Sequence, residues 1–161
     1  QHESTEGCLK ALSLLSEQHS FATPLDMGCG SGILAIAMAA LWQVPVLACD
    51  NDPEAVHVTL ENAQKNTMEQ FIQTKVSEGF SRLHNQHFDI ITANILAGPL
   101  CQMAEDANRA LSPGGFIVLS GLLNRQAEDV IAAYTSVGAK LFNQIFNGDW
   151  STLIMRKEKN G

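Results

Sequence analysis

Glycine recurs at alternate positions in one short segment of the sequence, at Gly28, Gly30 and Gly32. Because glycine lacks a Cβ atom, such a segment can turn sharply and let a ligand approach its backbone closely. A short apolar run at residues 24–27 precedes it, and a long apolar stretch at residues 31–42 follows. A strand, a glycine-rich turn and a helix in this order are typical of nucleotide and nucleoside sites. We therefore include the three glycines, the intervening Cys29 and the preceding Asp26 among the expected cofactor-binding residues.

Asp50 is a second acidic residue with an expected role, because it ends the next apolar run, 18 residues after Gly32 (50 − 32). A carboxylate at about this separation accepts hydrogen bonds from two ribose hydroxyls, and its neighbour Asn51 is expected to take part. The nicotinamide and flavin fingerprint G-x-G-x-x-G, counted from Gly28, requires glycine where the sequence has Ile33. S-adenosylmethionine (SAM) has no phosphate, carries a positive sulfonium and tolerates a nearby carboxylate. The acid-led loop therefore favours SAM over a dinucleotide.

The elements that must position these residues alternate between helices and short apolar strands. Strands are expected at residues 24–27, 46–49, 71–76, 88–95, 116–120, 139–146 and 150–155. Helices are expected around Leu9–Leu15, at 31–42, from Pro53 towards Asn66, at 100–111 and at 125–137. This alternation predicts an α/β fold with a mostly parallel, seven-stranded sheet covered on both faces, in which only the C-terminal hairpin is antiparallel. Ligands bind such sheets at the carboxyl ends of the strands, near the topological switch point.

Four local features refine this expectation. Residues 31–42 are apolar nearly all round, which predicts a buried helix. Asp52 is a capping-type residue, and Pro53 then occupies a favoured first helical position. Residues 112–115 (SPGG) predict a turn, and Asn147-Gly148-Asp149 has the chemistry of a hairpin turn.

Length and composition fit a single domain over residues 1–161. No apolar run approaches the roughly 18 residues that a membrane helix needs, and no signal-peptide pattern is present. We therefore expect a cytoplasmic protein without membrane contact. Because the chain starts at Gln1 without Met, inside an expected helix, we also expect it to be part of a longer protein.

The net charge and the arrangement of cysteine and histidine argue against some classes of function. A formal net charge of −7 argues against direct nucleic-acid binding, and is compatible with a small-molecule substrate or a basic protein partner. The four cysteines lack a C-x-x-C pair, so they predict small buried side chains in a reducing compartment rather than a zinc site or disulfides. His84 and His87 are close in sequence but have no third ligand nearby, which favours a surface loop. No metal site is expected.

Three segments spread over most of the chain carry a resemblance to a known family. They are LDMGCGSGILAIA at 25–37, CDNDPEAV at 49–56 with ENA at 61–63, and ANILAGPL at 93–100. In these segments the sequence resembles the class I SAM-dependent methyltransferases, and within them the PrmA family, which methylates a bacterial large-subunit ribosomal protein. The resemblance implies a Rossmann-like catalytic domain, SAM as the cofactor, S-adenosylhomocysteine (SAH) as its product, and a basic protein such as a ribosomal protein as the acceptor.

The resemblance also implies roles for two further segments. The opening His2–Thr5 looks like the tail of the family's glycine-histidine-threonine segment, which contributes to the SAM site and so implicates Thr5. The glycines before that tail and the family's small N-terminal substrate-recognition domain are not in this sequence, so the resemblance supports the catalytic fold more than the substrate. By its position in the fold, the turn containing Glu78 and Gly79 is expected to lie against the adenine.

Asn94 is the expected catalytic residue, and it is also expected to border the cofactor. It should stand at the carboxyl end of the fourth strand, where its carboxamide and the Ile95 carbonyl can accept a hydrogen bond from an amine. The alternative is that Asn94 only caps the following helix. DNA adenine and glutamine methyltransferases have Asn/Asp-Pro-Pro-aromatic here, whereas residues 94–97 read Asn-Ile-Leu-Ala, which argues against both. The sequence also lacks a cysteine nucleophile pattern for methylation at carbon five of pyrimidines.

We therefore expect an enzyme that transfers the methyl group in line onto a neutral amine nitrogen, most readily of a protein. Asn94 would orient the acceptor, and water would take its proton. Two alternatives stay open: a methyltransferase for a small molecule or another protein, since this fold serves many acceptors, and a SAM-binding module without catalysis. A nicotinamide-dependent oxidoreductase is a distant third, because the glycine spacing is wrong for it.

Overall fold

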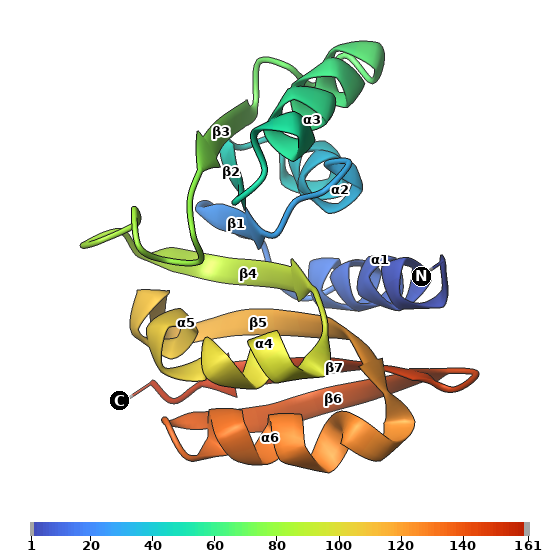
Figure 1. Ribbon diagram of the computed structural model, residues 1–161, viewed down its shortest axis with the longest axis vertical. Coiled ribbons are helices and arrows are strands. Elements are labelled where there is room, and N and C mark those ends of the chain that lie inside the picture. The colour runs from blue at the N-terminus through green and yellow to red at the C-terminus, as the bar shows by residue number, and fades with distance from the viewer. Residues whose placement is uncertain (1, 160–161) are drawn as a thin grey trace.

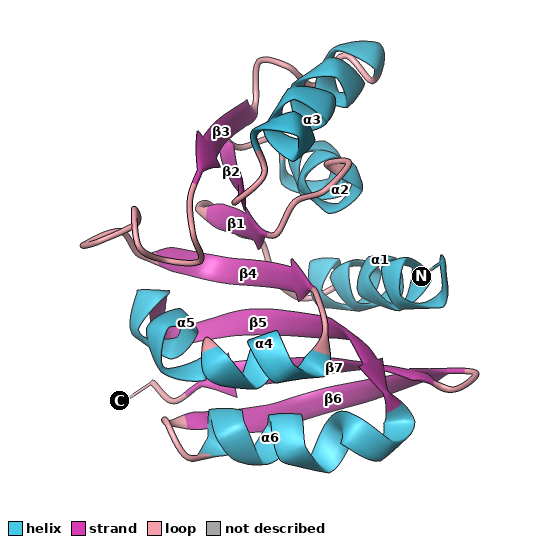
Figure 2. Ribbon diagram, viewed as in Figure 1, coloured by secondary structure: helices cyan, strands magenta, loops and turns pink. Residues whose placement is uncertain are grey.

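The computed structural model describes residues 2–159 and shows a seven-stranded sheet with helices on both faces (Figures 1 and 2). The strands are β1 Pro24–Met27, β2 Val46–Asp50, β3 Ile72–Val76, β4 Phe88–Asn94, β5 Leu111–Leu123, β6 Ala139–Asn147 and β7 Trp150–Lys157. The helices are α1 His2–Ser16, α2 Ile33–Trp42, α3 Pro53–Lys65, α4 Ala97–Gln102, α5 Ala104–Ala110 and α6 Ala127–Thr135, with a short 3-10 turn, η1, at Asn124–Gln126.

The strand order is β3-β2-β1-β4-β5-β7-β6, and it confirms the predicted α/β fold. The pairs from β3 through β5 are parallel, whereas β7 lies between β5 and β6 and is antiparallel to both. The order reverses between β1 and β4, which makes this pair the topological switch point. The C-terminal hairpin is confirmed, with Gly148 at φ 61° in its turn.

Each face of the sheet has its own apolar core. On one face, α1 and α2 contribute Leu12 and Met38 to a cluster that also contains Phe116. On the other face, α4, α5 and α6 contribute Leu100, Ala107 and Tyr134. The two-sided covering is therefore confirmed, and it leaves the carboxyl ends of the central strands as the edge where loops can form a site.

The predicted all-round burial of the helix at 31–42 is wrong. Helix α2 begins at Ile33, and its buried residues are Leu34, Ala35, Met38 and Ala39. Ile33 and Leu41 are about half exposed, at 50% and 44%. The helix packs against β1, β2 and α1, and Ile33 and Leu41 lie on the side that is left towards solvent.

The predicted continuous helix at 100–111 is also wrong. Helices α4 and α5 meet at Met103, and residues 112–115 belong to β5 rather than to a separate turn. The register between β4 and β5 shifts between Phe88 and Ile90, which accommodates the Pro-Gly-Gly irregularity in the strand. The helix expected from residue 125 begins with the 3-10 turn and becomes α-helical at Ala127.

Other local predictions are confirmed. The Asp52 side chain accepts a hydrogen bond from the Glu54 amide at 2.9 Å, and Pro53 is the first residue of α3. The four cysteines are free thiols; three are buried, but Cys101 is only partly buried, against expectation.

Candidate active site

A large cavity opens at the carboxyl edge of β1, β2 and β4, between the β3–β4 loop and helices α4 and α5. Its volume is about 1070 Å³. Six of the residues expected from the sequence line it, namely Gly28, Asp50, Asn51, Glu78, Gly79 and Asn94. The remaining five (Thr5, Asp26, Cys29, Gly30 and Gly32) do not line it, and lie beneath or beside it. The structure therefore brings residues from four separate parts of the chain to the switch point of the sheet.

The glycine loop joins β1 to α2 in a conformation that its sequence favours. Gly28, Gly30 and Gly32 all have positive φ, at 79°, 52° and 86°. A Cβ atom on Gly32 would lie 2.7 Å from Cγ2 of Thr59, so glycine is required there for both its conformation and its close approach. The amides of Gly28 and Cys29 both donate to the Cys49 carbonyl at 2.8 Å, which holds the loop against the end of β2.

Asp50 is held by the same loop. One of its carboxylate oxygens accepts from the Gly30 amide at 3.0 Å, and the other accepts from the Asp52 amide at 3.0 Å. Each carboxylate oxygen has a second acceptor direction. The carboxylate is thus fixed in orientation at the cavity wall and keeps capacity for two hydroxyl donors.

Asp26 lies beneath the cavity rather than on its surface. It is 1% exposed, and its Oδ1 accepts from the Thr92 hydroxyl at 2.8 Å, while the Ala35 amide at the start of α2 also acts on the carboxylate. Burial raises the pKa of Asp26 to about 7, against the opposing effect of the Thr92 hydrogen bond. Its side chain therefore supports the strand under the glycine loop, while its neighbour Met27 lines the cavity.

Cys29 also turns its side chain away from the cavity. It is 6% exposed, and its Sγ lies 3.3 Å from the Thr59 hydroxyl. Burial is the main cause that raises the pKa of Cys29 to about 12. This thiol is therefore part of the packing between the loop and α3, and only its backbone can serve a ligand.

Asn94 ends β4 and lines the cavity. Its Nδ2 donates to the Thr5 hydroxyl at 3.3 Å, whereas its Oδ1 is buried without a hydrogen-bond partner. The N-cap of α4 is Leu96, and no side chain caps that helix, so Asn94 does not act as the cap. A buried, unpaired acceptor is costly in a folded protein, and it is explained best where a ligand satisfies it.

Gly121 is a site residue that the sequence analysis missed. It has φ 92°, and a Cβ atom there would collide with the Ile95 carbonyl and lie 3.1 Å from Oδ1 of Asn94. Glycine at this point of β5 is what leaves room beside the Asn94 carboxamide. The available signal was a glycine inside an apolar strand run, which often marks a close approach of another backbone or ligand.

Helix α1 is fixed against this site by buried polar contacts. The Ser120 hydroxyl donates to the Ser4 carbonyl at 2.9 Å and lies 2.9 Å from the Thr152 hydroxyl. These contacts hold α1 so that the Thr5 hydroxyl accepts from Nδ2 of Asn94, although Thr5 itself does not line the cavity. Within residues 2–159, no three His, Cys, Asp or Glu side chains lie together as a metal ion would require, and no helix is long and apolar enough to cross a membrane.

The sequence of the chain matches that of proteins from one known family. The family model described as "Ribosomal protein L11 methyltransferase (PrmA)" matches residues 1–158. The ribosomal protein L11 methyltransferase of Chelativorans sp. is 40% identical over 159 residues, covering 97% of this chain and 55% of that protein. That of Rhizobium leguminosarum bv. trifolii is 41% identical over 155 residues, covering 94% and 53%. The chain thus spans about half the length of the curated relatives it matches.

Solved structures agree with this match. A ribosomal protein L11 methylase from Lactobacillus delbrueckii subsp. bulgaricus superimposes with a TM-score of 0.90 at 26% identity, covering 98% of this chain and 80% of that one. The N-methyltransferase NodS from Bradyrhizobium japonicum WM9, solved with SAH, gives a TM-score of 0.78 at 16% identity, covering 96% and 87%. The second likeness supports the fold alone.

Proposed function

The chain belongs to the ribosomal protein L11 methyltransferase (PrmA) family, and we propose that it transfers methyl groups from SAM to amine nitrogens of a protein acceptor. The observation that carries the proposal is Asn94, whose buried Oδ1 has no partner at the edge of a cavity that also contains the glycine loop and Asp50. An unpaired acceptor at this point suits an incoming N–H donor.

The residues of the cavity fit SAM. Asp50 and Asn51 would bind the ribose, because the Asp50 carboxylate is oriented at the wall with acceptor capacity to spare. The backbone of the glycine loop, from Asp26 to Gly32, would hold the methionine part, and the turn with Glu78 and Gly79 would lie against the adenine. When bound, SAM supplies an electrophilic methyl group on a positively charged sulfur.

The chain's own contribution to the chemistry is to position the acceptor. A lysine amine has an unperturbed pKa of about 10.4, so it must lose a proton before its lone pair can attack. Burial beside a positive charge favours the neutral amine. Oδ1 of Asn94 would accept a hydrogen bond from that amine, while Thr5 holds the other end of the carboxamide. Orientation of this kind supplies much of the rate, and the released proton can go to water.

We further propose that the acceptor is a basic ribosomal protein, as the names of the relatives suggest. The formal net charge of −7 favours association with a basic partner over one of like charge. Such an acceptor would place the reaction in the cytoplasm. The alternative of a SAM-binding module without catalysis is less favoured, because it leaves the buried Asn94 oxygen unexplained.

The test is to replace Asn94 with alanine and to measure SAH affinity by calorimetry and methyl transfer to protein L11. Loss of one preorganised hydrogen-bonding group at a reacting centre typically lowers kcat by about 100-fold or more. We expect a loss of that size with SAH affinity largely retained. Asn143→Ala, on the exposed part of β6, is the matched control and should leave both quantities unchanged. Normal turnover by Asn94→Ala would exclude the proposed role.

A further inference from the structure

A β-bulge in β5 lies directly behind the candidate active site. The pairing of β5 with β7 is regular up to Leu119 and resumes at Leu122. Ser120 and Gly121 therefore lie opposite a single residue of β7, Thr152, which is the pattern of a bulge. Bulges are frequent next to active sites, where they redirect a side chain. This bulge decides where Ser120 and the residues after it point.

The bulge reverses the alternation of side chains along β5. Val118 belongs to the apolar cluster on the face covered by α1, and Leu119 belongs to the cluster on the other face. In an unbroken strand Leu122 would lie on the same face as Val118, because successive side chains alternate. It instead joins the cluster that contains Leu119. The bulge thus lets the polar Ser120 face α1 while the next apolar side chain remains in the opposite core.

The Ser120 hydroxyl is completely buried and has a hydrogen-bond partner on each side. It donates to the Ser4 carbonyl at 2.9 Å, and its oxygen lies 2.9 Å from the Thr152 hydroxyl. Because a hydroxyl has one hydrogen to donate, the Thr152 hydroxyl is the donor in the second contact. A buried polar network whose members all have partners holds one arrangement. The position of the α1 residue after Ser4, which is Thr5, is therefore fixed from β5.

The backbone of Ser120 holds the residue that Thr5 contacts. Ser120 pairs with Asn94 in the parallel ladder, and its carbonyl accepts from the Ile95 amide at 3.1 Å. The Thr5 hydroxyl accepts from Nδ2 of Asn94 at 3.3 Å, and this contact leaves Oδ1 as the unpaired acceptor. Ser120 therefore fixes both sides of the contact that orients the Asn94 carboxamide, although it does not line the cavity itself.

We propose that Ser120 is a positioning residue for methyl transfer. Its hydroxyl holds the turn of α1 that carries Thr5, and Thr5 in turn holds the Asn94 carboxamide. Oδ1 of Asn94 is thereby kept available to the acceptor amine. The inference deepens the proposed function and rests on it, because it takes Asn94 as the residue that orients the acceptor.

The first measurement is the rate of methyl transfer by Ser120→Ala. This change removes the hydroxyl but keeps the backbone contact with Ile95. An acceptor that is poorly oriented at the reacting centre reacts more slowly even when it is bound. We expect kcat to fall by about tenfold, while the KM for the acceptor protein and the SAH affinity stay within about twofold of those of the unchanged chain. Unchanged kcat would overturn the role of Ser120.

A double-mutant cycle with Thr5→Val tests the route of the effect. Thr5→Val keeps the side-chain shape but removes the hydroxyl that accepts from Asn94. If Ser120 acts through Thr5, Ser120→Ala should lower kcat by less than about twofold once Thr5→Val is present, because coupled residues are not additive. An equally large loss in both backgrounds would overturn the route, because it would show that Ser120 acts independently of Thr5.

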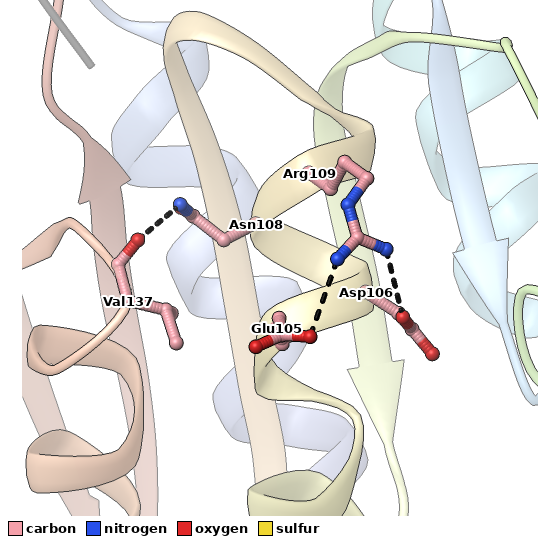
Figure 3. Close-up of polar contacts among 5 residues, drawn as sticks. All are labelled: Glu105, Asp106, Asn108, Arg109 and Val137. Atoms are coloured by element: carbon pink, nitrogen blue, oxygen red, sulfur yellow. Dashed lines mark hydrogen bonds and ion pairs between the residues drawn. The ribbon is translucent and has the colours of Figure 1, made fainter.

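Asn108→Ala is the matched control for lost stability. Figure 3 shows Nδ2 of Asn108 donating to the Val137 carbonyl, at 2.7 Å, whereas Arg109, which lines the cavity, extends from the other side of α5. Asn108→Ala therefore removes a buried hydrogen bond from a side chain to a carbonyl, outside the site. It should lower the free energy of unfolding but leave kcat unchanged. A loss of kcat equal to that of Ser120→Ala would overturn the proposal, because lost stability alone would then explain it.

Thr152 offers a second pair of variants, should Ser120→Ala not fold. Thr152→Val removes the hydroxyl that donates to Ser120, and Thr152→Ser retains it. We expect Thr152→Val to lower kcat by about threefold and Thr152→Ser to stay close to the unchanged chain. Equal kcat values in these two variants would contradict the positioning role of the network and overturn the proposal.

A readout other than turnover separates this proposal from the proposed function. Exchange of the Asn94 side-chain amide with water, followed by NMR, reports how firmly Thr5 holds it. We expect this exchange to be about fivefold faster in Ser120→Ala than in the unchanged chain, and unaltered in Asn108→Ala. Unaltered exchange in Ser120→Ala would overturn the proposal. Absence of methyl transfer by the unchanged chain would instead overturn the proposed function, whatever the amide shows.

Discussion

At the scale of single residues, side-chain direction decides what a residue can do. The sequence motif places Asp26 beside the glycine loop, but successive side chains in a strand point to opposite faces of the sheet. In β1 it is Met27 that faces the cavity, and Asp26 turns towards Thr92 inside the protein. Asp50 and Asn94 could be placed correctly from their positions at strand ends. Gly121 could not, because its role depends on how closely the Ile95 carbonyl approaches β5.

The buried Asp26 predicts a specific dependence of stability on pH. Its pKa is about 7 in the folded protein against 3.8 in the unfolded chain. Below about pH 4 the carboxyl is protonated in both states. Between about pH 4 and pH 7 the unfolded chain releases this proton while the folded protein retains it, so the free energy of unfolding falls as pH rises. Above about pH 7 the carboxyl is ionised in both states, and the free energy of unfolding stops falling on account of Asp26.

Asp26→Asn removes this titration while keeping the side-chain shape. As the pH rises from about 5 to 8, the free energy of unfolding should therefore decrease in the unchanged protein by about 3 kcal/mol more than it decreases in the variant. Urea unfolding at the two pH values measures the difference. Asp149→Asn, at the exposed hairpin tip, should behave like the unchanged protein. Parallel pH profiles for Asp26→Asn and the unchanged chain would show that the carboxyl does not titrate in this range.

At the scale of elements, strand positions follow from apolar runs and turn residues, and β1 was placed at its observed bounds. The burial and the continuity of a helix are harder to predict from sequence, as the partly exposed α2 and the break at Met103 show. Both depend on which side of the helix meets the sheet, and a uniformly apolar run has no periodicity that reports it. The β3–β4 loop is the hardest case, because its shape comes from hydrogen bonds within the loop.

The Ser77 side chain stabilises that loop, so replacing it should lower the affinity of the cofactor site for SAH. Its hydroxyl donates to the Gly79 carbonyl at 2.7 Å and accepts from the Arg82 amide at 3.3 Å. Ser77→Ala removes both hydrogen bonds, and their loss should destabilise the ordered turn by about 1 kcal/mol. If the turn must be ordered to bind SAH, the affinity for SAH should fall about fivefold. Turnover at saturating SAM should change little.

Calorimetric titration with SAH measures this effect. Ser136→Ala is the control, because it also removes a hydroxyl-to-carbonyl hydrogen bond, at the end of α6 away from the cavity. Unchanged SAH affinity in Ser77→Ala would mean that the Glu78–Gly79 turn keeps its shape without this side chain, or that it does not contact the ligand.

At the scale of the whole molecule, the site joins parts of the chain that are distant in sequence. Thr5 meets Asn94 across 89 residues, and Asp50 meets Gly30 across 20. The contributing strands β1, β2 and β4 are neighbours in one continuous sheet. The alternation of strands and helices and the parallel topology were predictable, because strands separated by helices of this length form right-handed crossover connections. The hairpin joins the free edge of β5 through β7 rather than β6, and the sequence pattern did not predict which of its two strands would pair there.

Because the site spans this sheet, SAH should stabilise the chain as one cooperative unit. A ligand that binds only the folded state at about 100 times its Kd adds about 2.7 kcal/mol. For a protein of this size that corresponds to a rise in Tm of roughly 5–10 °C. Calorimetric scans with and without SAH should show a single transition that moves as a whole. Two transitions, of which SAH moves only one, would mean that β1–β3 and β4–β7 unfold separately, and that the contact between Thr5 and Asn94 does not couple them.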